Sequence, residues 1–154
     1  MRGDGRMDVG VAPTVELRMP PRPENLALAR LALAGVGSLA GASDGDIADL
    51  KLAVTEACTN AILHAYGDGA AGDLVVRYRV GAGRVEVEVE DDGAGFDPDD
   101  PGARASEQGG EGMGLLIIRT LTDALEIDSD PSGSCIFFSK AVGGDAQGGA
   151  RPAG

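Results

Sequence analysis

Two alternating segments joined by glycines constrain the fold of this chain more than any other feature. In residues 73–80, DLVVRYRV, and 84–91, RVEVEVED, apolar side chains alternate with charged ones, and Gly-Ala-Gly separates the segments. Alternation with a period of two indicates a strand, and a short glycine-containing connection joins antiparallel neighbours. The pattern predicts a hairpin with a dry face and a wet face, on which Arg77 and Arg79 oppose Glu86 and Glu88.

The rest of the chain predicts helices that cover one face of a sheet containing this hairpin. Periodic apolar residues and stop signals indicate these further elements: strand 14–19, helix 24–39, helix 44–66, helix 112–121, and strands near 124–128 and 134–140. Helices on one face of a mixed, mostly antiparallel sheet form a two-layer α/β sandwich. One domain is expected over 13–142, and the glycine-rich ends, 1–12 and 143–154, are expected to be disordered.

Charge and cysteine content narrow the function classes. The formal net charge of the 154 residues is −12, which repels nucleic acids and anionic membranes, and no basic patch offsets it. Cys58 and Cys135 show no metal-ligand spacing and are interpreted as buried free thiols of a reducing compartment. No apolar run approaches the ~20 residues that cross a bilayer, and no signal peptide is recognisable. We therefore expect a cytoplasmic protein without membrane or nucleic-acid partners.

A polar stripe runs along the otherwise apolar helix at residues 55–66, TEACTNAILHAY. Glu56, Asn60 and the only histidine, His64, recur every four residues and so share one side of the helix. On a helical wheel Leu52 and Leu63 flank Glu56, which gives its carboxylate large apolar neighbours. This pattern is typical either of a solvated helix edge or of the floor of a polar cleft.

A second candidate site residue follows from the register of the strand RVEVEVED. Alternation points its three valines toward the core and places Asp91 on the same side. A buried carboxylate needs a partner, and Gly93 and Gly95 remove side-chain bulk beside it. The arrangement suits a pocket for a donor such as an exocyclic amine, although aspartate and glycine are also ordinary turn residues.

A third feature is the pair of glycines in Gly112-Met113-Gly114, at the start of an apolar helix. Glycines there let a ligand approach the backbone, and the exposed N–H groups favour anions, although simple packing explains most such patterns. The sixteen residues 96–111 before this helix show no periodicity. Their place between the two candidate subsites predicts a lid.

The three candidate motifs, taken in chain order, resemble the three nucleotide boxes of the GHKL ATPases, which share the Bergerat fold. They are E-x-x-x-N on a helix, D-x-G-x-G after a strand and G-x-G before a helix. The separations, 35 residues from Glu56 to Asp91 and 21 from Asp91 to Gly112, match as well. More narrowly, residues 14–141 resemble the anti-sigma-factor serine/threonine kinases of bacterial partner switching. The segments that carry this resemblance are PENLALARLALAGVG, DIADLKLAVTEACTNAILHAY, VEDDGAGFDP and EGMGLLIIRTLTD.

This resemblance implies a protein kinase that uses ATP and Mg²⁺. It implies that Glu56 acts as, or assists, the general base, that Asn60 coordinates Mg²⁺, and that Asp91 accepts a hydrogen bond from the adenine amino group. The resemblance implies nucleotide contacts for a larger set: Gly93, Gly95, Gly112, Met113, Gly114 and Ser134, the last in place of a family threonine. His64 matches a family histidine, and closing the helix end is the role expected for it.

The implied function is that of an anti-sigma factor in transcription regulation. It would phosphorylate a serine or threonine of a STAS-type anti-anti-sigma partner, sequester a sigma factor in its other state, and form a homodimer as family members do. Arg30 falls where the family uses an arginine for partner contacts, and an ordinary solvated arginine is the alternative interpretation.

One departure from the family pattern leaves alternatives open. Some members carry an arginine just before the G-x-G to meet the terminal phosphate, whereas Gly109, Gly110 and Glu111 stand here, and Arg104 would have to swing in. The alternative function is an ATP-binding sequestering module with little or no kinase activity. Histidine kinases of the same superfamily are disfavoured because the chain is too short for a phosphoacceptor hairpin or a sensor, but a detached histidine-kinase catalytic domain stays an alternative. An α/β domain with accidental glycines would bind no ATP.

Overall fold

The computed structural model describes residues 14–66, 72–81, 83–93, 111–130 and 132–143, except for the side chains of 64–66, 111, 112 and 130. In these residues the elements follow in the order β1 (Thr14–Met19), a 3-10 turn η1 (Pro23–Asn25), α1 (Leu26–Ala40), α2 (Asp44–Tyr66), β2 (Leu74–Gly81), β3 (Arg84–Asp91), α4 (Glu111–Leu121), β4 (Ala124–Asp130) and β5 (Gly133–Ala141). The predicted helices and strands are confirmed, with ends that differ by a few residues.

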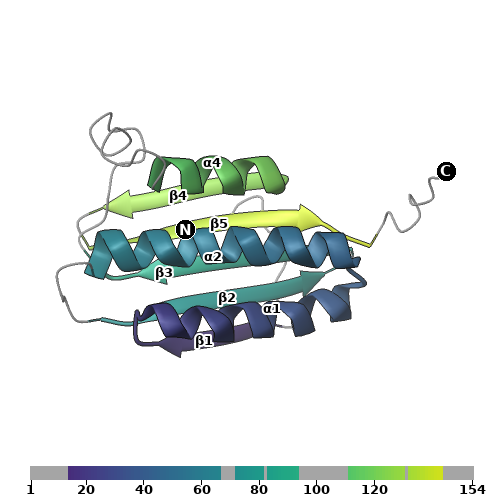
Figure 1. Ribbon diagram of the computed structural model, residues 1–154, viewed down its shortest axis with the longest axis horizontal. Helices are drawn as coiled ribbons and strands as arrows, with labels where there is room; N and C mark the ends of the chain where they lie inside the picture. Colours follow the sequence, from purple (N-terminus) through teal and green to yellow (C-terminus); the bar gives the residue numbers. More distant parts are fainter. Residues whose placement is uncertain (1–13, 67–71, 82, 94–110, 131, 144–154) are drawn as a thin grey trace.

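The strands form one sheet in the order β1-β2-β3-β5-β4, and each of its four pairings is antiparallel. All three helices lie on the same face of this sheet (Figure 1). Helix α1 packs on β2, α2 on β3 and β5, and α4 on β4. The predicted two-layer α/β sandwich is therefore confirmed.

The core lies between the helices and the sheet. Alternate residues of the three central strands are buried there: Leu74, Val76, Tyr78, Val80, Val85, Val87, Val89, Ile136 and Phe138. Small residues on the helices let α1 and α2 approach the sheet closely, and Ala29, Ala53 and Ala57 are almost fully buried. The buried Tyr78 hydroxyl donates a 2.6 Å hydrogen bond to the carbonyl of Ala29, which fixes α1 against β2.

Helix α2 begins with a reciprocal cap that also holds the end of β5. The Asp46 N–H donates to Ser43 Oγ at 3.0 Å, and Asp46 Oδ2 accepts from the N–H groups of Ser43 at 3.1 Å and Gly143 at 3.2 Å. Burial raises the pKa of Asp46, but these hydrogen bonds and the charge of Lys140 outweigh it, so that the pKa lies below its ordinary value. The start of α2 and the last strand are thus joined directly.

The sheet face opposite the helices carries the predicted ladder of charges. Arg77 lies opposite Glu88 and Arg79 opposite Glu86, and Nη1 of Arg77 is 3.4 Å from Glu88 Oε1. The prediction of a wet face was wrong at its centre, because Glu86 is only 1% exposed. Arg79 and Arg84 reach it from both sides, at 3.7 and 3.3 Å, and their positive charges compensate the buried carboxylate.

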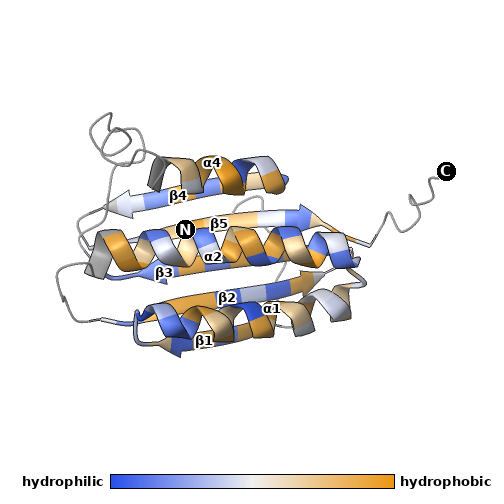
Figure 2. Cartoon of the chain, in the orientation of Figure 1, coloured by the Kyte–Doolittle hydropathy of each residue, from blue (hydrophilic) through white to orange (hydrophobic). Residues whose placement is uncertain are grey.

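The helices also expose large apolar side chains to solvent. Figure 2 shows that hydrophobic and hydrophilic residues alternate along the helices. The large apolar residues that the described helices expose are Leu28, Leu31, Leu39, Leu52, Leu63, Met113 and Leu116. None of the helices in the described ranges has the length and hydrophobicity needed to cross a membrane.

Candidate functional site

Two of the predicted polar side chains meet a glycine where α2 packs against α4. Glu56 and Asn60 lie one turn apart on α2, and Gly114 lies in the second turn of α4. A Cβ atom added to Gly114 would lie 2.9 Å from Glu56 Oε1 and 3.5 Å from Asn60 Oδ1. Any side chain at this position would therefore displace the Glu56 carboxylate. The absence of a side chain lets the start of α4 approach both polar groups.

Asn60 is the most deeply buried polar residue of this group. It is 2% exposed, and its Nδ2 atom has no hydrogen-bond partner within the described part of the chain. Leaving a buried amide unsatisfied costs about 1–3 kcal/mol, so the position favours a polar ligand that completes its hydrogen bonding. Asn60, in the middle of the stripe, therefore does not lie on a solvated helix edge.

This donor set fits a Mg²⁺ ion that arrives with phosphates. An amide oxygen such as Asn60 Oδ1 is a suitable ligand for a hard cation. Among the described residues no group of three or more histidine, cysteine, aspartate or glutamate side chains forms a metal cage. Mg²⁺ commonly binds through one or two protein groups together with substrate phosphates, and Asn60 next to Gly114 matches this pattern.

The other predicted carboxylate, Asp91, is the last residue of β3 and is 6% exposed, as the register predicted. It lies opposite Ser134 on β5, whose hydroxyl donates a 2.6 Å hydrogen bond to Asp91 Oδ2. The Gly93 N–H donates to Asp91 Oδ1 at 2.9 Å. Both oxygens keep a free lone-pair direction, so the carboxylate can accept from a ligand's amino group.

The elements that carry Glu56, Asp91 and Gly114 meet at one end of the sheet. In Figure 1 the C-terminal ends of α2 and β3 and the N-terminal end of α4 all point to the left edge of the sheet. The first turn of α4, where Gly112 lies, is therefore at the same end of the sheet as the end of β3, which Asp91 forms.

Several predicted positions lie elsewhere or outside the described residues. Met113 is on α4 and is 46% exposed. Gly95, the lid 96–110 and Arg104 lie outside the described residues, as does the side chain of His64. The neighbours proposed to shield Glu56 are themselves exposed, Leu52 by 44% and Leu63 by 53%, and it is Gly114 that closes on the carboxylate.

Arg30 of α1 is half-buried rather than freely solvated. Its Nη1 atom is 3.3 Å from the hydroxyl of Thr55, the residue before Glu56. Near it, burial raises the pKa of the Cys58 thiol to about 12 although the charge of Arg30 opposes this, so the thiol stays protonated and is not a nucleophile. The predicted burial of both cysteines as free thiols is confirmed.

Sequence reasoning missed Gly133, the first residue of β5. Its φ is +146°, and an added Cβ would overlap the carbonyl oxygen of Asp91 and lie 2.9 Å from the Cα of Asp92. The available signal was the dipeptide Gly133-Ser134, in which a glycine precedes a residue already assigned to the base-binding end.

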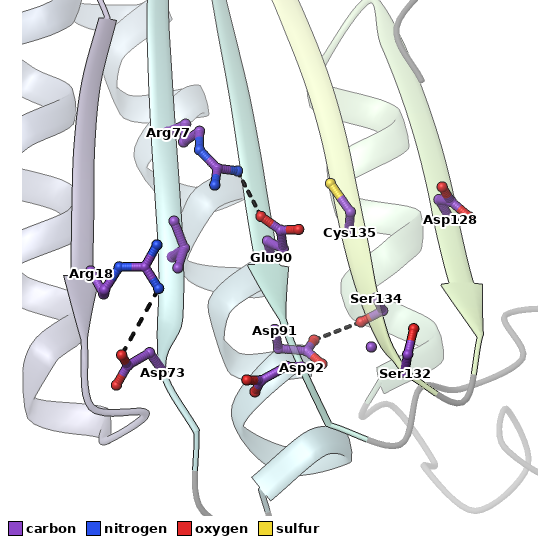
Figure 3. A pocket seen from close by; sticks show the side chains of 12 residues that line it. Arg18, Asp73, Arg77, Glu90, Asp91, Asp92, Asp128, Ser132, Ser134 and Cys135 are labelled. Atoms are coloured by element: carbon purple, nitrogen blue, oxygen red, sulfur yellow. Dashed lines mark hydrogen bonds and ion pairs between the residues drawn. The ribbon is translucent and has the colours of Figure 1, made fainter. Parts of the chain in front are cut away.

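A cavity of about 440 Å³ lies on the face of the sheet that the helices leave uncovered. Arg18, Val75, Glu90, Cys135 and Asp128 form one cross-strand row along it. Figure 3 shows Arg18, Glu90, Cys135 and Asp128 of this row, together with Asp91 and Ser134 near the strand ends. Asp91, Gly133 and Ser134 also line this cavity, whereas Glu56 and Asn60 do not.

Comparison with known proteins agrees with this geometry. Residues 19–140 match the family described as histidine kinase-like ATPase domain. The chain is 38% identical to the serine-protein kinase RsbW of Bacillus velezensis, over 85% of this chain and 87% of that protein. It is 35% identical to the RsbW of Bacillus subtilis, with the same coverage of 85% and 87%.

A solved structure supports the fold. The RsbU and RsbW domains of Rv1364c from Mycobacterium tuberculosis superpose with a TM-score of 0.63 at 23% identity, covering 84% of this chain and 32% of that one. The matching family and the curated relatives cover most of the chain. The chain therefore belongs to the histidine kinase-like ATPase domain family and, within it, to the RsbW serine-protein kinases.

Proposed function

We propose that the chain binds Mg-ATP in the cleft between α2, α4 and the end of β3, and transfers the terminal phosphoryl group to a serine or threonine of a STAS-type anti-anti-sigma protein. In its other state it binds and sequesters a sigma factor. The observation that supports the proposal is the close approach of Glu56 and Asn60 to Gly114, because a carboxylate and an amide oxygen there lie against the first residues of α4.

Each residue has a defined role in this reaction. The hydroxyl oxygen of the partner's serine or threonine bonds to the γ-phosphorus of ATP while the bond from this phosphorus to the ADP oxygen breaks. Glu56 takes the proton of that hydroxyl. Asp91 accepts from the amino group of the base, and the N–H groups at the start of α4 hold the phosphates. Asn60 would hold Mg²⁺, which, when bound, neutralises charge on the phosphates.

The exposed apolar residues of α1 support a protein partner. Leu28 and Leu31 are 50% and 71% exposed, and they lie on either side of Arg30 in the sequence. Exposed apolar side chains next to a cation are typical of protein-binding surfaces. Through Thr55, Arg30 also contacts the helix that carries Glu56. We further propose that the protein acts in the cytoplasm. We also propose that it forms a homodimer, and light scattering of the purified chain tests this oligomeric state.

The decisive experiment incubates the full chain with [γ-³²P]ATP, Mg²⁺ and a STAS-domain protein encoded beside its gene. We expect label on a serine or threonine of the partner, and Glu56→Ala should lower the rate about 10²- to 10⁴-fold while ATP still binds. Glu24→Ala, an exposed residue of η1, is the matched control and should keep the parent rate.

Two other outcomes would contradict the proposal in different ways. ATP binding without any transfer would identify the chain as a sequestering module. Failure of the parent chain to bind ATP in calorimetry with Mg²⁺ would remove both the kinase and the module.

A further inference from the structure

The sheet face turned away from the helices is buried, although all three described helices lie on the other face (Figure 1). Phe137 and Cys135 of β5 alternate with the core residues Ile136 and Phe138, and so they point to this face. Each of them is nevertheless only 2% exposed. The buried residues of this face, called the open face below, are Val75, Glu86, Glu88, Cys135, Phe137 and Ser139.

The burial of Phe137 requires a cover above the sheet. In the register Phe137 lies between Glu88 and Glu126, and Cys135 and Ser139 flank it along its own strand. Neighbours in a pleated sheet cover the sides of a side chain and leave its tip in contact with solvent. Glu88 is itself only 5% exposed. A polypeptide segment that lies across the strands accounts for the burial of both side chains.

Residues 1–13 are the segment best placed to lie there, because they lead directly into Thr14 at the start of the edge strand β1. The four strand spacings from β1 to β4 measure about 19 Å, and thirteen extended residues reach at most about 43 Å. The other long segments outside the described residues are anchored on the helix side. Residues 94–110 lead into α4, and 144–154 follow Gly143, whose N–H donates to Asp46 of α2.

The sequence of this segment, MRGDGRMDVGVAP, has the pattern of a strand-like cover. Charged residues stand at even positions and apolar residues or glycines at odd positions, and a period of two is typical of a segment that lies on a sheet. In an extended backbone its apolar side chains therefore share one side, which can meet Phe137. The alternating residues are Arg2, Asp4, Arg6 and Asp8, and then Met7, Val9 and Val11.

The charge of the open face favours a segment that brings arginines. Its described side chains include four arginines, Arg18, Arg77, Arg79 and Arg84, and a larger number of carboxylates, so the balance is negative. Arginine is well suited to carboxylates on a partly desolvated surface. The carboxylates of this face are Glu16, Glu86, Glu88, Glu90, Glu126 and Asp128.

We propose that residues 1–13 dock across the open face of their own chain, with their apolar side on Phe137 and with Arg2 and Arg6 toward the carboxylates. The proposal is independent of the function proposed for the cleft. It replaces the expectation of disorder for residues 1–12, which came from their glycine content. The docked segment makes this face unavailable to a second copy or to another protein, so such partners bind on the helix side or at the edge strands.

The two cysteines provide the test. Cys135 lies on the open face, whereas Cys58 belongs to the core between helices and sheet, so its labelling reports opening of the whole domain. The full chain is treated with N-ethylmaleimide, and mass spectrometry of its peptides measures the rate at each thiol. We expect slow labelling of both in the parent. In the full-length double variant Arg2→Glu, Arg6→Glu, Cys135 should react at least about 10-fold faster while Cys58 stays slow, because access limits the reaction of a buried thiol.

The matched control reverses two exposed arginines away from the open face. Arg22 precedes η1 and Arg119 lies in the last turn of α4. The double variant Arg22→Glu, Arg119→Glu should label Cys135 at the parent rate. Equal protection of Cys135 in the parent and in Arg2→Glu, Arg6→Glu would overturn the proposal. Protection that is lost when the parent is diluted would overturn it too, because a second copy would then be the cover.

Disulfide trapping gives a second measurement that holds even if the charge variant opens the whole domain. Single variants Gly3→Cys, Gly5→Cys and Gly10→Cys are oxidised at low protein concentration, with Gly148→Cys as the control. We expect an intramolecular disulfide to Cys135 from at least one of the first three and none from the control. Its absence from all three, or its formation only between two chains, would overturn the docking of residues 1–13.

Discussion

Replacing Gly114 with alanine should make the protein more stable and less active at once. Gly114 is an interior residue of α4, where alanine is more favourable than glycine by about 0.8–1 kcal/mol. For a domain of this size such a gain raises the melting temperature by roughly 3 °C. The nearest described atoms to the new Cβ belong to Glu56 and Asn60, and the closest of them is the end of a flexible side chain, so the fold itself should accommodate it.

The cost falls on the reaction. With the added Cβ 2.9 Å from Glu56 Oε1, the carboxylate must move by roughly 0.5 Å to reach ordinary van der Waals separation. Because a displacement of about 1 Å can cost 10²-fold in rate, we expect phosphoryl transfer to slow by about 10- to 100-fold. Single-turnover transfer from [γ-³²P]ATP measures the rate, and thermal unfolding followed by circular dichroism measures the stability.

Gly35→Ala provides the matched control on α1. Nothing lies within 4 Å of the Cβ that it would add, so it should raise stability by a similar amount and leave transfer unchanged. If Gly114→Ala transferred phosphate within about twofold of the parent rate, Glu56 would not be held against α4 as described. Equal losses in both glycine variants would likewise refute the reasoning.

Three other substitutions probe separate parts of the molecule. In Asp91→Asn only one side-chain oxygen remains, so the side chain cannot accept hydrogen bonds from both the Ser134 hydroxyl and the Gly93 N–H. The affinity for ATP, measured by calorimetry, should therefore fall at least about 10-fold, and an undiminished affinity would contradict the base contact. The lowered pKa of Asp46 contributes stability that is present above the ordinary value of 3.8 and is lost as the pH falls through the lower folded value. Asp46→Asn should therefore cost about 1 kcal/mol in urea unfolding at pH 7 and no more than a few tenths near pH 2. Tyr78→Phe removes a fully buried hydrogen bond and should cost about 1–2 kcal/mol with an unchanged transfer rate; no loss of stability would argue against that bond.

The strand register was the part of the fold that the sequence predicted best. Alternation in RVEVEVED carries side-chain direction with it, so the inward position of Asp91 and the pairing of Arg77 with Glu88 followed from the pattern. A helical repeat gives similar information within one element, which is why Glu56 and Asn60 could be placed together. These predictions needed only neighbouring residues.

What the sequence could not show depends on contacts between distant elements. The approach of Gly114 to Glu56 arises from packing of α2 on α4, and no local pattern encodes that distance. The same holds for Gly133, whose need for glycine comes from the backbone of another strand. The burial of Glu86 was missed because alternation gives a direction but says nothing about what covers a face.

The buried carboxylate of Glu86 has a consequence for natural variation among relatives. Removing Glu86 leaves Arg79 and Arg84, whose side chains are 18% and 37% exposed, without their counter-charge, at a cost of up to about 3–5 kcal/mol, whereas exchanging the whole group for apolar residues is often neutral. Glu86, Arg79 and Arg84 should therefore covary: relatives keep all three or replace them jointly. A survey that found Glu86 exchanged for leucine beside two retained arginines would show that the charges are not energetically coupled.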